Sequence, residues 1–102
     1  MTHDDRLNQE NWAVLYAVQA FAGLISRNMI AIFLDTSPDN ITVHFALREI
    51  TADTEEEIED MLLELDAQYD MDAPALSAEV HVGPPGEDWK EKRYRVVYWA
   101  KE

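Results

Sequence analysis

Residues 53–69, DTEEEIEDMLLELDAQY, are the stretch on which the fold prediction depends. Apolar residues recur there with the i, i+3, i+4, i+7, i+11 spacing of a helix that buries a single stripe. Asp53 and Thr54 are each followed three residues later by Glu, which is the spacing of a capping box and predicts where the helix begins. The remaining positions are mostly polar, so only the stripe can be covered. The stripe consists of Ile58, Met61, Leu62, Leu65 and Tyr69.

The side of this helix that faces away from the stripe is strongly acidic. Residues 49–72 contain eleven carboxylates and neither Lys nor Arg. Like charges four residues apart destabilise a helix by a few tenths of a kcal/mol per pair, a cost that a binding role would explain. Leu63 lies among the acids, as an apolar centre within a charged rim, which is a common anatomy for a protein interface. The residues that we predict to contact a partner are Glu56, Glu59, Asp60, Leu63, Asp66 and Asp70.

The net charge of the whole chain bears on the class of partner. The chain has 21 acidic and 8 basic residues, which gives a formal net charge of −13. That sign disfavours nucleic acid and anionic membranes as partners and favours basic proteins. A simpler interpretation is a solvated helix with one exposed leucine, in a protein whose charge only keeps it soluble.

Residues 8–27 are predicted to form the other long helix. Its apolar residues lie almost all around the helix axis, so it should be covered by the sheet and a second helix, or also by a dimer contact. The apolar run at residues 12–25 is shorter than the roughly 20 residues that a membrane-spanning helix needs, which favours a buried helix. The polar start of the chain is unlike a signal peptide, and cysteine is absent, so we expect a cytoplasmic protein.

Four further segments have the patterns of β-strands. Residues 29–35 and 41–49 flank a turn that contains proline, and they predict a hairpin. Residues 76–82 and 93–101 suggest a second hairpin, separated by the loop signal GPPG at residues 83–86. The predicted order is α-β-β-α-β-β. We therefore expect an α+β fold with a four-stranded, mainly antiparallel sheet and two helices packed on one face, in a single domain of 102 residues.

The last strand should present different side chains to the core and to the exterior. Strict alternation places Tyr94, Val96 and Tyr98 towards the helices. It places Val97 and Trp99 on the opposite side of the sheet, where an exposed apolar pair would need a cover. A homodimer or another partner would provide that cover.

The sequence contains no motif typical of catalysis or of cofactor binding. A catalytic carboxyl needs a pocket that raises its pKa, whereas these acids lie on a solvated helix. The pattern of a calcium-binding loop is also absent. His44 and His81 lie on the polar sides of their strands and could meet across the sheet, but a surface or partner-contacting role is favoured over a zinc site. We therefore predict no enzyme activity, no cofactor and no metal.

Residues 18–31 (VQAFAGLISRNMIA), 45–49 (FALRE), 55–60 (EEEIED) and 98–102 (YWAKE) form a set that can be compared with known families. They resemble small acidic immunity proteins of bacterial polymorphic-toxin systems, including those of contact-dependent growth inhibition. The resemblance covers roughly residues 12–102. It implies a cytoplasmic protein that binds the toxic C-terminal domain of an incoming effector, often a nuclease, and blocks its active site or substrate path. It does not supply the binding residues, because toxin-contact positions differ between such proteins.

The leading hypothesis combines this resemblance with the acidic helix. The chain would be an immunity protein that neutralises a basic toxin domain, of the nuclease type, by occupying its active site or substrate groove. The alternative is a small acidic dimeric adaptor or structural protein with no toxin partner. Association that is steered by charge slows steeply as ionic strength rises, so salt dependence distinguishes the two.

Overall fold

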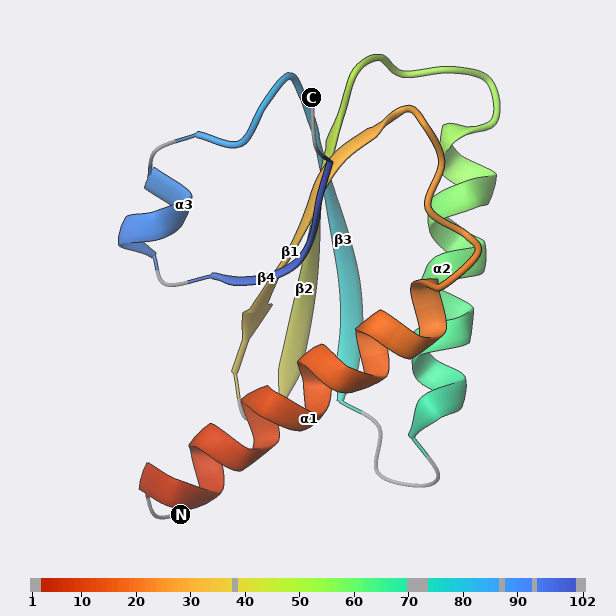
Figure 1. The fold of residues 1–102 in the computed structure, drawn as a ribbon. Helices are drawn as coiled ribbons and strands as arrows, with labels where there is room; N and C mark the ends of the chain where they lie inside the picture. The colour runs from red at the N-terminus through yellow and green to blue at the C-terminus, as the bar shows by residue number, and fades with distance from the viewer. Residues whose placement is uncertain (1–2, 38, 70–73, 87, 93, 101–102) are drawn as a thin grey trace.

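The computed structural model describes residues 3–37, 39–69, 74–86, 88–92 and 94–100. A four-stranded sheet carries two long helices on one side, which confirms the predicted α+β class (Figure 1). The predicted order α-β-β-α-β-β is also confirmed, with one short additional helix between the last two strands. The elements are α1 (His3–Phe21), β1 (Met29–Thr36), β2 (Asn40–Leu47), α2 (Thr54–Gln68), β3 (Ala75–Val82), α3 (Asp88–Glu91) and β4 (Arg95–Trp99).

The strands lie in the order β3-β2-β1-β4. β1 is antiparallel to both β2 and β4, so the first predicted hairpin and the mainly antiparallel character of the sheet are confirmed. β2 and β3 are parallel. A parallel pair needs a crossover connection, and α2 provides it while burying its apolar stripe against the sheet.

The predicted second hairpin is wrong, because β3 and β4 lie at opposite edges of the sheet. The connection between them contains α3, and Trp89 of α3 packs against Phe33 of β1 with ring centroids 4.9 Å apart. Burial of this large aromatic side chain outweighs the local turn signal. The chain therefore crosses the side of the sheet opposite α2 before β4 begins, as Figure 1 shows.

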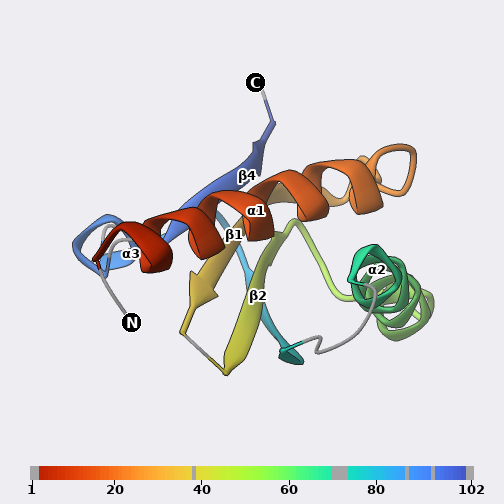
Figure 2. The same ribbon diagram turned by 90° about the horizontal axis from the view of Figure 1, so that it is seen from below.

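The main hydrophobic core lies between the sheet and the helices α1 and α2 (Figure 2). Ala13, Ala17 and Ala20 of α1 are buried, and their small side chains let α1 approach closely. From α2, the predicted stripe points inward: Ile58, Met61 and Leu65 are buried, and Leu62 and Tyr69 are partly buried against the same core. This packing leaves the opposite side of α2 in solvent.

The orientation of side chains on β4 differs from the prediction. The pairing of β1 with β4 shifts register between Ile32 and Phe33. This irregularity turns the strand so that both Val97 and Tyr98 pack against the main core, whereas Val96 is 51% exposed. Trp99 does lie on the other side, where its ring is 5.6 Å from that of Phe33. Tyr94 also packs on that side rather than against the helices.

α1 begins and ends earlier than predicted. It ends at Phe21, and Gly23 follows with a φ of +83°, a left-handed conformation that favours glycine and stops a helix. The outer side of α1 stays uncovered, because Trp12, Leu15 and Val18 are about half exposed. α1 therefore packs on both the sheet and α2, as predicted, but keeps an exposed apolar side, and the predicted alternative of an additional dimer contact stays a prediction. Neither α1 nor any other helix in the described part of the chain has the length and apolar character to span a bilayer.

Candidate partner-binding surface

The start of α2 is fixed by hydrogen bonds among threonines. Thr54 is buried, and its Oγ1 accepts a hydrogen bond of 2.9 Å from the backbone N–H of Thr51. The Oγ1 atoms of Thr51 and Thr54 are 3.2 Å apart, and Thr51 Oγ1 accepts from the N–H of Asp53 at 3.2 Å. The side chain of Asp53 makes no capping bond, so the capping box predicted for Asp53 is wrong. The threonine contacts fix where α2 begins, and burial of Ile58, Met61 and Leu65 sets its rotation on the sheet.

This rotation exposes the predicted contact residues together. Leu63 is 67% exposed. Glu59, Asp60 and Asp66 lie three or four residues from it along the helix, so they share its side of α2. Asp70 lies outside the described residues. The acidic surface is defined here as the exposed residues Glu56, Glu59, Asp60, Leu63 and Asp66.

A groove of about 550 Å³ lies beside the acidic surface, between α2 and the beginning of β3. Glu59 and Asp66 contribute carboxylates to it, and the other lining residues are apolar. The groove itself was not predicted, although Glu59, Leu63 and Asp66 in its lining belong to the predicted contact residues. It forms because the parallel pairing of β3 with β2 brings the start of β3 next to α2. The residues that line it are Glu59, Leu62, Leu63, Asp66, Pro74, Ala75 and Leu76.

The negative charge of α2 is not neutralised within the described residues. The ion pairs found there with Lys or Arg join Lys92 to Asp88 and Arg95 to Glu10, at 3.5 and 3.4 Å, and both lie away from α2. The first turn of α2 holds Glu55, Glu56 and Glu57, and its last turn holds no basic residue. The surface therefore offers an uncompensated negative field around one exposed leucine.

A family model described as the MafI2 immunity protein matches residues 10–102. The chain belongs to this family. This membership confirms the resemblance to immunity proteins of polymorphic-toxin systems. A comparison with curated proteins finds no match.

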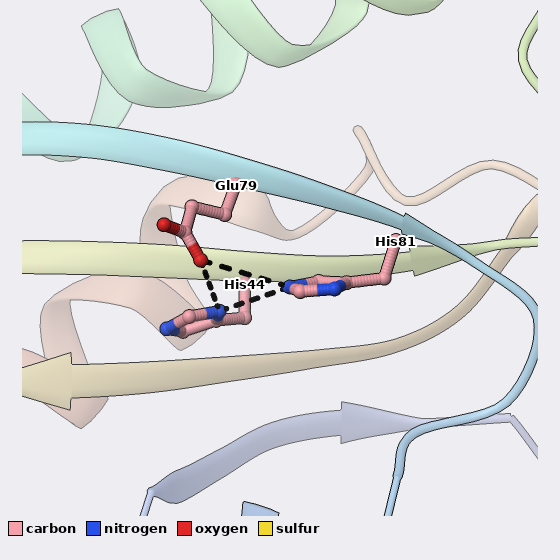
Figure 3. A group of neighbouring side chains, drawn as sticks. All are labelled: His44, Glu79 and His81. Carbon is pink, nitrogen blue, oxygen red and sulfur yellow. Dashed lines mark hydrogen bonds and ion pairs between the residues drawn. The ribbon is translucent and has the colours of Figure 1, made fainter.

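A second group of polar side chains in this MafI2 family member lies on the side of the sheet that carries α3. The parallel register places His44 of β2 opposite Glu79 of β3, and Ala46 opposite His81, so the three polar side chains share one side of the sheet (Figure 3). His44 Nδ1 is 3.2 Å from His81 Nε2 and 3.4 Å from Glu79 Oε2. His81 Nε2 is 3.9 Å from the same Glu79 oxygen. The histidine cluster is defined as these three residues.

His44 is the buried member of the histidine cluster, whereas His81 is partly exposed and Glu79 is exposed. His44 is only 4% exposed, and its ring stacks on that of Tyr94 at a centroid distance of 4.4 Å. The ring of Trp89 meets that of His81 edge to face at 4.8 Å. Burial lowers the pKa of His44, and His81 lowers it further, while Glu79 acts in the opposite direction. Burial therefore favours the neutral form of the His44 imidazole.

The prediction that His44 and His81 could meet across the sheet is confirmed by their contact. Glu79 was not part of that prediction. The available signal was the spacing of Glu79 and His81, two residues apart, which places both on the same side of one strand. The register with His44 depended on the parallel pairing, which the sequence did not reveal.

Proposed function

We propose that this immunity-family protein neutralises a cognate toxin by binding a basic groove of the toxin domain through its acidic surface. The observation that carries the proposal is the exposed Leu63, which lines a mainly apolar groove and lies among carboxylates with no basic partner in the described part of the chain. Membership of an immunity family supplies the context. The complex would form in the cytoplasm of the protected cell.

The chemistry of a nuclease suits such a partner. Nucleases bind a polyanion, so their substrate grooves carry Lys and Arg. An acidic helix that enters such a groove competes with the substrate for the same positive charge. Complementary charge steers the encounter and raises the association rate, whereas desolvation of an apolar anchor such as Leu63 slows dissociation. Charge would therefore govern how fast the toxin is captured, and Leu63 how long it is held.

The test uses two charge-reversal variants of equal net charge. Glu59→Lys/Asp66→Lys changes the acidic surface, whereas Asp35→Lys/Glu49→Lys changes exposed acids outside α2. The binding partner in this test is the cognate toxin domain, to be sought in the reading frames next to the gene for this chain. The first variant should associate at least about tenfold more slowly at low salt and lose protection of cells that express the toxin. The second should retain protection. Full protection by Glu59→Lys/Asp66→Lys would refute the assignment of the surface.

A second candidate function is a dimeric adaptor, and the half-exposed Trp12, Leu15 and Val18 on α1 favour it. These residues are spaced three apart and form an apolar stripe that a second copy could cover. Sedimentation of the wild type and of Leu15→Glu tests this idea. A dimer that Leu15→Glu dissociates, together with toxin association that does not change with salt, would favour the adaptor. A monomer would exclude it.

A further inference from the structure

The three polar atoms of the histidine cluster converge on one point. His44 Nδ1, Glu79 Oε2 and His81 Nε2 lie 3.2, 3.4 and 3.9 Å from one another. Ligand atoms held about 2.0–2.1 Å from a tetrahedral Zn²⁺ lie about 3.3 Å apart. The spacing of the three atoms is therefore close to that of one triangular face of a tetrahedral zinc site (Figure 3).

Both of the shorter contacts in the cluster involve the same atom, His44 Nδ1. Neutral imidazole has one N–H and one lone pair, and an ionised carboxylate only accepts. Hydrogen bonds can satisfy these groups, because either ring can be the donor and the exposed Glu79 carboxylate also meets solvent. A shared cation satisfies all three at once.

The cluster is held in position by the fold. Its residues come from two adjacent strands with continuous parallel pairing from Asn40↔Ala75 to Leu47↔Val82. Tyr94 stacks on the His44 ring, and Trp89 packs against His81. The two histidine rings would therefore lose little side-chain freedom when an ion binds, and preorganisation of this kind favours affinity.

From this geometry we infer that His44, Glu79 and His81 form a binding site for a divalent first-row transition metal. Two imidazoles and one carboxylate suit Zn²⁺, whereas Mg²⁺ and Ca²⁺ prefer oxygen ligands. Glu79 is 60% exposed, so the fourth position opens to water or to a group of a partner. The bound ion would join the edge strand β3 to β2. This inference is independent of the proposed toxin contact, because the site lies on the other side of the sheet.

The experiment is a calorimetric titration of chelator-treated protein with Zn²⁺ in an excess of Mg²⁺, which occupies weak carboxylate sites. Wild-type protein should bind one Zn²⁺. His81→Ala and Glu79→Gln should each weaken this binding about tenfold or more. Both positions are partly exposed, so two independent variants remain informative if one folds poorly. The matched controls are His3→Ala, which removes the remaining histidine, and Glu64→Gln, which removes an exposed carboxylate of α2.

A Co²⁺ titration gives a second readout, because a four-coordinate Co²⁺ site with nitrogen ligands has intense visible absorption bands. These bands should appear with wild type, His3→Ala and Glu64→Gln, and should be lost with His81→Ala. Equal Zn²⁺ affinity in all variants would show that Zn²⁺ binds outside the histidine cluster and would overturn the inference. Absence of saturable Zn²⁺ binding by the wild type in Mg²⁺ would overturn it as well.

Discussion

The acidic surface and the histidine cluster lie on opposite sides of one sheet and are built in different ways. The acidic surface comes from a single helix, is exposed, and has no compensating ion pair within the described residues. The histidine cluster joins two strands that are far apart in sequence, and His44 within it is only 4% exposed. Exposed like charges act at long range and suit the capture of a macromolecule. Enclosed donor atoms act at short range and suit an ion.

The largest effect should come from the inner side of α2, which supports the acidic surface. Leu65 is fully buried, so Leu65→Ala should lower the free energy of unfolding by about 2–5 kcal/mol. Leu63 on the same helix is the matched control, and Leu63→Ala should stay within about 0.5 kcal/mol of wild type. Urea denaturation followed by circular dichroism measures both. Equal losses would mean that α2 is rotated differently on the sheet.

The next effect concerns the histidine cluster. An ion that binds only the folded state stabilises it, by about 2.7 kcal/mol when its free concentration is 100 times its Kd. Zn²⁺ at that concentration should therefore raise the free energy of unfolding of the wild type, and a chelator should reverse the gain. His81→Ala should show no gain. An equal gain in the free energy of unfolding of His81→Ala would mean that Zn²⁺ binds at another site.

The outer leucine should matter for binding. If Leu63 is the anchor of the toxin interface, Leu63→Ala should lose about 2 kcal/mol of affinity, which is about a 30-fold rise in Kd. The rise should appear mainly as faster dissociation, since the charges that steer association remain. Surface-bound toxin domain gives both rate constants. Val82→Ala, at an exposed apolar residue of β3 outside the groove lining, is the control and should bind normally.

The smallest effect tests whether the acids cost stability. Asp60 has Glu56 four residues before it and Glu64 four residues after it. Asp60→Asn removes both repulsions and should raise the free energy of unfolding by a few tenths of a kcal/mol, less at high salt. Toxin association should slow in the same variant. A stability gain without slower association would leave the acidic surface with a solubility role only.

Particular residues show where sequence patterns were sufficient to predict which side of an element is buried, and where they were not. The helical spacing of Ile58, Met61 and Leu65 correctly predicted the buried side of α2, and with it the exposure of Leu63. Strict alternation failed on β4, because one register shift placed Val97 and Tyr98 on the same side. Local turn chemistry failed after β3, because contacts of Trp89 with a strand distant in sequence decided the route of the chain.

The amino-acid sequence by itself determined the two long helices, the first hairpin, the net charge and the acidic side of α2. These features depend on the periodicity of apolar residues and on contacts between residues close in sequence, and both can be read from the spacing of residue types along the chain. Only the tertiary structure decided that β3 lies parallel to β2 and that β4 lies at the other edge. That choice created both the groove beside Leu63 and the contact of His44 with Glu79 and His81. Pairing between strands distant in sequence depends on the apolar surface that the whole sheet buries, and this quantity cannot be read from any short segment of the sequence.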